Sequence, residues 1–227
     1  MPDHQFEEPL IDSKVSIPRI LALWLVPKNL SPKEISFEEE HLRSYLPFKK
    51  AREYKYTRSY TRFALSNLFK IDPIEIPLIA LPGKPPLLQE GWGHISISHC
   101  HDLLLIGWSP EKIGVDIERI DRSFSSNKIL DRYLTLTEKE KVNRLNKVER
   151  EKAILSHWVI KEASLKWQRG SLFKDLFLWE WNQKLKSSHH KLLDYKVNVE
   201  IIKYKKWLIG IAFDKKIHPN NIFFCQH

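Results

Sequence analysis

The sequence is poor in the features of secreted and membrane-spanning proteins. Its 227 residues include only two cysteines, Cys100 and Cys225, which gives no disulfide framework. The longest apolar runs, residues 20–26 and 103–108, are strand-sized, whereas a bilayer-spanning helix needs about 20 apolar residues. Residues 1–10 contain acidic side chains and lack the apolar stretch of a secretory signal. We therefore expect a cytoplasmic protein with no membrane partner.

Other signatures are also missing. The seven glycines form no Gly-rich phosphate loop of the Walker or Rossmann type, and the chain has no internal repeat or low-complexity segment. Hydrophobic residues make up 42% and charged residues 29% of the chain, as in an ordinary globular protein with a core. The length fits one large domain, or two small ones that share a core.

What the chain does have is positive charge. A net charge of +9 favours an anionic partner, which could be nucleic acid, a phosphorylated small molecule or an acidic protein. The basic residues gather in the segment 49–62, where tyrosines are interleaved with them. Arginine suits phosphate, and basic residues beside aromatic ones also suit nucleic acid. A solvated helix face with inward tyrosines explains the same pattern.

The first part of the chain predicts helices followed by strands. Residues 1–15 read as a loose lead-in and 20–26 as a buried strand. Ser31 is expected to cap a helix that has Pro32 at N1 and Glu34 at N3. A helical pattern from 37 to about 69 breaks at residues 46–47, and a proline-rich irregular connection follows. Residues 94–98, 103–108 and 113–117 then predict an antiparallel meander.

The remaining chain predicts the same order again. Thr135 is expected to cap a helix with an acidic first turn, and residues 149–168 form a long helix. Residues 176–181, 195–202 and 207–213 read as strands of a second sheet. Helices followed by strands, twice, predict an α+β fold.

Two carboxylates, Asp116 and Glu118, lie two residues apart at the end of the predicted strand 113–117. Alternate side chains of a strand share a face, so Val115 and Ile117 would enter the core while Asp116 and Glu118 point together to the other side. The two charges repel each other, and a divalent cation between them would relieve the repulsion. Carboxylate oxygens suit magnesium. A solvated strand face is the alternative.

The long helix offers a third carboxylate. Trp158, Glu162 and Lys166 are four residues apart and share one helix face. Glu162 could therefore complete the metal site, and Lys166 could meet a phosphate that the metal holds. An exposed Glu–Lys pair, worth a few tenths of a kcal/mol, would give the same spacing.

A strand end at Ser98 and His99 presents a hydroxyl and an imidazole. They could contact a phosphate, or they could satisfy backbone groups at a turn. Cys100 lies between His99 and His101, but adjacent residues do not easily face one metal and the usual zinc spacings are absent. A Cys–His nucleophile pair has no evident orienting partner.

The proline-rich connection contains a further candidate, Gly83-Lys84-Pro85. Its glycine allows the backbone to approach a flat ligand closely, and its lysine can meet a phosphate.

In this order, the motifs resemble the 4'-phosphopantetheinyl transferase superfamily. The resemblance rests on GVDIE at residues 114–118 and WxxKEAxxK at residues 158–166, and it covers about residues 45–175. The chain looks like the longer, surfactin-synthetase-activating type. This implies two similar halves related by a pseudo-twofold axis, residues 1–110 and 111–227. Each half would pack a small antiparallel sheet against helices, with the active-site cleft between the halves.

The resemblance also implies a role for each motif. The metal, Mg²⁺ or Mn²⁺, would be held by Asp116, Glu118 and Glu162. Coenzyme A would be contacted by Arg62, Gly83, Lys84, Pro85, Ser98, His99, Lys161 and Lys166, with Arg58 as a looser candidate. The chain departs from the family after the last lysine, where residues 168–171 contain one glycine.

The implied reaction moves the 4'-phosphopantetheine group of coenzyme A to a serine of an apo acyl or peptidyl carrier protein. The serine attacks the β-phosphorus, and adenosine 3',5'-bisphosphate leaves. Glu162, directly or through a metal-bound water, is the catalytic base, and Lys166 is the catalytic cation near the leaving group. The carriers of this family are generally acidic, which suits the basic chain; fatty-acid, polyketide and nonribosomal-peptide carriers all stay open. We expect a monomer.

Two other functions would use the same sequence differently. A nucleic-acid-binding protein acting through residues 49–62 would show steep salt dependence and would need neither Asp116 nor Glu162. An inactive relative serving as an interaction module would keep the fold but would not bind magnesium. The complete carboxylate set favours an enzyme, and we expect no nucleic-acid partner.

Overall fold

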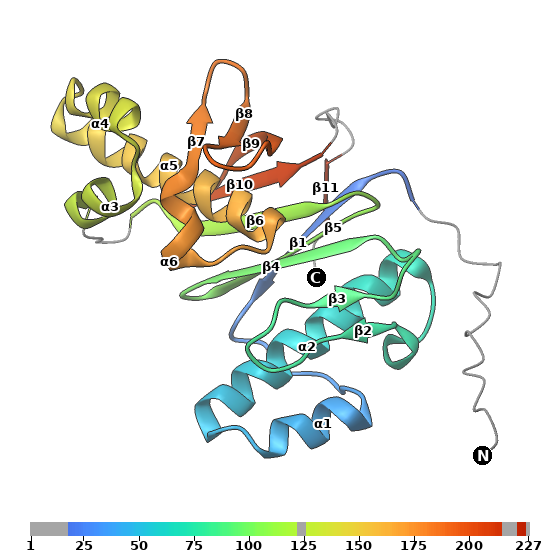
Figure 1. Cartoon of the computed structure of the whole chain (residues 1–227). Helices are drawn as coiled ribbons and strands as arrows, with labels where there is room; N and C mark the ends of the chain where they lie inside the picture. Colours follow the sequence, from blue (N-terminus) through green and yellow to red (C-terminus); the bar gives the residue numbers. More distant parts are fainter. Residues whose placement is uncertain (1–17, 122–125, 215–221, 226–227) are drawn as a thin grey trace, which may run out of the picture.

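The computed structural model describes residues 18–121, 126–214 and 222–225, so the predicted lead-in at residues 1–15 lies outside the described residues. Figure 1 shows two main sheets flanked by helices. One sheet has the strand order β11-β1-β5-β4 and the other β6-β10-β9-β8-β7. The predicted α+β class is confirmed. In the described part of the chain, no helix is both long enough and apolar enough to cross a bilayer.

The first sheet is covered by the helices that precede most of its strands. Strand β1 (Leu21–Pro27) is followed by α1 (Phe37–Ser44) and α2 (Phe48–Phe69), as the pattern and the break at 46–47 predicted. Tyr56 and Tyr60 of α2 pack with Trp24, Ile106 and Trp108 in one apolar cluster. A short turn η1 (Pro73–Glu75) and the pair β2 (Leu78–Ile79) and β3 (Leu87–Leu88) form the connection to β4.

The predicted start of the first helix at Ser31 is wrong. Residues 31–36 are not helical, and α1 begins after Ser36. Ser36 forms a capping box with Glu39, and both serines have a glutamate three residues later, so local pattern does not distinguish them. The difference is tertiary, because Glu39 also accepts a hydrogen bond from the buried Arg62 at 2.6 Å.

The predicted meander is also wrong. Strands β4 (His94–Cys100) and β5 (Leu103–Ser109) form an antiparallel hairpin, but β6 (Ile113–Arg119) pairs with β10 (Trp207–Phe213) in the second sheet. The apolar face of β6 explains this, because Val115 and Ile117 are buried against strands of both sheets. Strand β6 thus closes the core between the sheets, and its other face turns toward the second set of helices.

The second half places a long helix on the outer face of the second sheet. After β6 come the helices α3 (Ser126–Tyr133), α4 (Leu136–Asn143), α5 (Lys147–Gln168) and α6 (Leu172–Asp175). They are followed by the turn η2 (Leu176–Leu178) and by the strands β7 (Trp179–Asn182), β8 (Ser187–His190) and β9 (Lys196–Tyr204). Thr135 caps α4 with a capping box, as predicted. Helix α5 packs on the sheet through Ile160, Ala163 and Trp167. The layers therefore run α2, first sheet, second sheet, α5.

The strand β11 (Ile222–Cys225) returns to the first sheet, where it pairs with β1 in parallel. A segment of the predicted second half thus extends the sheet of the first. The 110/111 boundary and the pseudo-twofold relation of the halves stay predictions.

Close packing of β6 against α5 depends on Gly114. A Cβ at this position would overlap the backbone of Ala163 and Trp167 in α5. Because a helix backbone cannot move aside as a side chain can, we expect Gly114→Ala to destabilise the fold by about 3 kcal/mol. Chemical denaturation would measure this. As a comparison, Gly83→Ala should cost about 1 kcal/mol, since only its positive φ is strained; equal losses for the two variants would contradict the packing argument.

Candidate functional site

A cavity of about 750 Å³ opens between α2, the 82–86 segment, β4 and the C-terminal end of α5. Three of the predicted site segments meet here: Gly83, Lys84 and Pro85 on one side, His99 on β4, and Lys166 on α5. Gly83 has a φ of 73°, in the left-handed region that glycine adopts without strain. The chain thus gathers residues more than 80 positions apart around one hollow.

A polar cluster at this cavity joins three elements. The Oδ1 atom of Asp116 on β6 accepts hydrogen bonds from the Ser98 hydroxyl on β4 and from the Lys166 ammonium on α5, both at 2.7 Å. Lys166 also donates to the Ser98 hydroxyl at 2.9 Å. The Oδ2 atom of Asp116 is buried and has no hydrogen-bond partner. One oxygen of this carboxylate is therefore available inside the site.

The other two predicted carboxylates lie beside this cluster. Glu118 accepts a hydrogen bond from the Trp158 indole at 3.0 Å, so it also faces α5. Burial raises the pKa of Glu162 to about 7, and the negative charges of Asp116 and Glu118 add to the effect while Lys166 opposes it. The predicted shared face of Asp116 and Glu118 is therefore observed, and it meets the Glu162 side of α5.

The donor set suits a hard divalent cation. Among the described residues, no group of three or more His, Cys, Asp or Glu side chains is arranged as a ready-made metal site. The chemistry nevertheless fits, because three carboxylates repel one another around an unpartnered oxygen of Asp116. The ammonium of Lys166 pairs with Asp116 and offsets only part of this negative charge.

The raised pKa of Glu162 predicts how stability depends on pH. Between a pH of about 4.5 and 7, the folded carboxyl retains a proton that the unfolded chain releases, so stability falls as pH rises through this window. The shift corresponds to a loss on the order of 3 kcal/mol. Magnesium should reverse the loss at about pH 8, where the carboxylates are ionised, but should have little effect at about pH 5.

Thermal unfolding with and without magnesium would check this expectation. The matched variant Glu162→Gln cannot ionise at this position, so it should lose most of the pH dependence in that window. A wild-type melting temperature that magnesium leaves unchanged at about pH 8 would contradict a metal site here.

The structure does not bring Arg62 or Lys161 to the cavity. Arg62 is buried, and it donates to Glu39 and to the backbone carbonyls of residues 73, 74 and 76. Lys161 is completely buried and pairs with Glu138 at 2.8 Å. Both cations hold elements of the fold together. In this structure Arg62 and Lys161 therefore have structural roles, and neither makes the predicted contact at the cavity where coenzyme A would bind.

The arginine of α2 that lines the cavity is Arg58, and not the predicted Arg62. It lines the cavity with only 7% of its surface exposed, and its Nε and Nη1 atoms have no hydrogen-bond partner. Burial lowers the pKa of its guanidinium. Arg58 and Arg62 are one turn apart on α2, so the sequence showed two candidate arginines but not which one faces the cavity.

Other cavity residues gave little signal in the sequence. Lys50 lies on the basic helix, and Arg169 ends α5 in a left-handed conformation with a φ of 60°. With Arg58, Lys84 and Lys166 they make the lining strongly basic, whereas Glu53 is the one carboxylate in the described lining. The segment 168–171, where the chain departs from the family pattern, therefore contributes the cation of Arg169 to the cavity.

A family model matches the part of the chain that contains the predicted metal carboxylates. The model of the 4'-phosphopantetheinyl transferase superfamily matches residues 112–212, a region that contains Asp116, Glu118, Glu162 and Lys166. This match supports the superfamily that the motifs indicated. The superfamily is named for transfer of the 4'-phosphopantetheine group. No curated protein matches the chain.

Proposed function

We propose that the protein transfers the 4'-phosphopantetheine group of coenzyme A to a serine hydroxyl of an apo acyl or peptidyl carrier protein, in a magnesium-dependent reaction of the holo-acyl-carrier-protein synthase type. The observation that carries this proposal is the contact of Ser98, Asp116 and Lys166 at the edge of a basic cavity. Carboxylates for a metal and cations for phosphates lie side by side there, as transfer of a phosphoryl-linked group requires.

Coenzyme A suits the cavity by charge and size. Its phosphates would meet the cations of the lining, and the volume of about 750 Å³ lies in the range of small-molecule sites. The adenine would lie beside the backbone of Gly83, where the absence of a side chain allows close approach. His99 and Ser98 would contact phosphate oxygens from β4.

The chemical step needs a base for the serine and positive charge for the leaving group. Glu162 takes the serine proton as the general base. The serine oxygen then bonds to the β-phosphorus, while the bond to the leaving adenosine 3',5'-bisphosphate breaks. Lys166 stabilises negative charge on the phosphate oxygens. Magnesium held by Asp116, Glu118 and Glu162 would supply further positive charge to the pyrophosphate.

The buried donors of Arg58 predict a specific contact with the 3'-phosphate of coenzyme A. We expect Arg58→Met to raise the KM for coenzyme A by about 100-fold, because a charge-assisted contact in a buried site is lost. The same variant should use dephospho-coenzyme A almost as well as the wild type does. Steady-state kinetics with both substrates would measure this difference.

The exposed Arg52 on the same helix provides a matched control. Arg52→Met removes a guanidinium outside the cavity lining and should leave both KM values unchanged. Equal losses with the two substrates in Arg58→Met would contradict a contact with the 3'-phosphate.

The overall proposal is tested by intact-protein mass spectrometry. Apo carrier proteins of the fatty-acid, polyketide and nonribosomal-peptide types would be incubated with this protein, coenzyme A and magnesium. The expected result is a mass gain of one phosphopantetheine that disappears when magnesium is chelated. Failure with every carrier, together with no binding of coenzyme A, would overturn the proposal.

We also infer the finer features that the resemblance implied. The protein is of the surfactin-synthetase-activating type and acts as a monomer, with two related halves in one chain. Its carrier partner is acidic, which complements the net charge of +9. Sedimentation of the purified protein tests the oligomeric state, and the salt dependence of the KM for the carrier tests the charge complementarity.

A further inference from the structure

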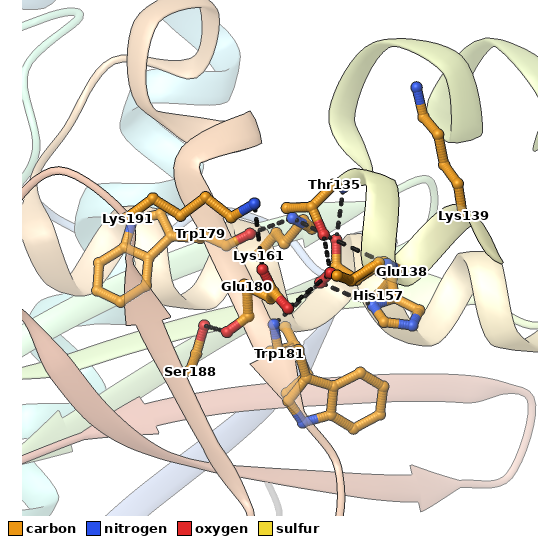
Figure 2. A network of polar contacts seen from close by, with 12 residues as sticks. Thr135, Glu138, Lys139, His157, Lys161, Trp179, Glu180, Trp181, Ser188 and Lys191 are labelled. Carbon is orange, nitrogen blue, oxygen red and sulfur yellow. Dashed lines mark hydrogen bonds and ion pairs between the residues drawn. The ribbon is translucent and has the colours of Figure 1, made fainter. Parts of the chain in front are cut away.

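A buried ionic network is centred on Glu138 and Lys161 (Figure 2), which are not among the residues that line the basic cavity. At its centre, the Glu138 carboxylate on α4 accepts hydrogen bonds from the Lys161 ammonium at 2.8 Å and from the Trp181 backbone N–H at 2.9 Å. The backbone N–H of Thr135 donates to the same carboxylate at 2.8 Å. His157 Nδ1 lies 3.2 Å from it. The network thus joins α4, α5 and the strand β7.

The two charges at the centre are fully withdrawn from water. Glu138 is 1% exposed and Lys161 is 0% exposed. Burial opposes the ionisation of Glu138, but hydrogen bonds and charges from His157 and Lys161 hold its pKa at about 2. A buried ion pair of this kind adds little stability compared with apolar residues of the same volume, although removing one partner alone is costly. Stability therefore does not explain why this pair is present.

The geometry of α5 offers another explanation. Lys161 directly precedes Glu162, and it also donates to the backbone carbonyl of Trp179 in β7. Along the same helix, Trp158 donates to Glu118 and Lys166 donates to Asp116. A helix held on one side by directional bonds to α4 and β7 can neither rotate nor slide freely. The groups that face β6 are then fixed as well.

We propose that Glu138 and Lys161 are positioning residues, whose buried pair fixes the rotation and axial position of α5 and so places Glu162 and Lys166 opposite Asp116. This inference rests on the proposed function for its catalytic consequence, but its structural part can be measured without turnover. The indole N–H of Trp158, bonded to Glu118 across the α5–β6 contact, reports the position of the helix.

The test is the double variant Glu138→Gln, Lys161→Met, which removes both charges and leaves no buried ion unpaired. The NMR signal of the Trp158 indole, identified by its loss in Trp158→Phe, is expected to shift and to exchange faster with solvent. The kcat for transfer should fall by about 100-fold, the effect of a displacement of about 1 Å at a reacting group. The KM for coenzyme A should change by less than about threefold, since most of the cavity lies on other elements.

The exposed pair of Lys186 and Glu200, 3.1 Å apart, provides the matched control. Its double variant Lys186→Met, Glu200→Gln makes the same chemical changes at another place in the second sheet. It should change neither the NMR signal of the Trp158 indole nor the kcat for transfer. A folded Glu138/Lys161 variant with a wild-type Trp158 signal and wild-type kcat would overturn the proposal.

Two further outcomes keep the test decisive. If the double variant does not fold, Glu138→Asp takes its place: it keeps the charge but shortens the reach, so the same shift and loss of kcat are expected, and unchanged values would overturn the proposal. If the wild-type protein transfers nothing, the proposed function fails, while the Trp158 signal still shows whether the pair positions α5.

Discussion

Glu162→Gln is expected to lower kcat by about a thousandfold while the protein gains stability at about pH 8. The two effects have one cause. Without a metal, burial and the like charges nearby raise the pKa of Glu162 to about 7, so its ionised form is unfavourable at about pH 8. The same carboxylate is the general base of the proposed reaction. Glutamine keeps the shape and removes the charge. Mass-spectrometric assay of turnover with magnesium, and thermal unfolding without magnesium, would measure the two effects.

The exposed Glu151 on the same helix is the control for this prediction. Glu151→Gln makes the identical chemical change outside the site, so it should alter neither kcat nor the melting temperature appreciably. Turnover by Glu162→Gln within about tenfold of the wild type would remove Glu162 from the mechanism.

Lys166→Met is expected to lower kcat/KM by about 100- to 1000-fold, because its ammonium contacts Ser98 and Asp116 where charge would develop on the phosphates. Without magnesium, this variant should also be less stable than the wild type, since the buried Asp116 loses its cation. Magnesium should then raise the melting temperature of the variant more than that of the wild type. Kinetics and thermal unfolding with and without magnesium would test both parts.

Lys152→Met serves as the control, because Lys152 is exposed on the same helix. It removes one positive charge from the protein without touching the site, so a general effect of net charge would appear in both variants. A loss of kcat/KM below about tenfold in Lys166→Met would show that the ammonium does not act on the phosphates.

Several features followed from the sequence because they depend on neighbours along the chain. Alternation in β6 put Val115 and Ile117 into the core and Asp116 and Glu118 on the opposite face. Four-residue spacing put Trp158, Glu162 and Lys166 on one face of α5. Trp158 and Lys166 contact the two carboxylates of β6, and the charges of these carboxylates raise the pKa of Glu162 further above the value that burial gives it. Strand and helix periodicities are local properties of the backbone, so they can be predicted without knowledge of the fold.

Other features required the tertiary structure. The strand β8, with the sequence Ser-Ser-His-His, has no apolar alternation and is a strand only because β7 and β9 pair with it. The strand β11 likewise joins the first sheet through β1, some 200 residues away in sequence. In both cases hydrogen bonds to distant segments outweigh the weak local preference.

The same distinction applies within the site. The sequence determined that a basic helix carries Arg58 and Arg62 one turn apart, but only the fold decided that Arg58 lines the cavity and Arg62 binds Glu39. The sequence likewise showed that Lys161 is next to Glu162. Only the fold brings Glu138 to Lys161, where the two form a buried ion pair. Spacing along a helix determines which side chains share a face, but the partner that each side chain on that face meets depends on packing between residues far apart in sequence.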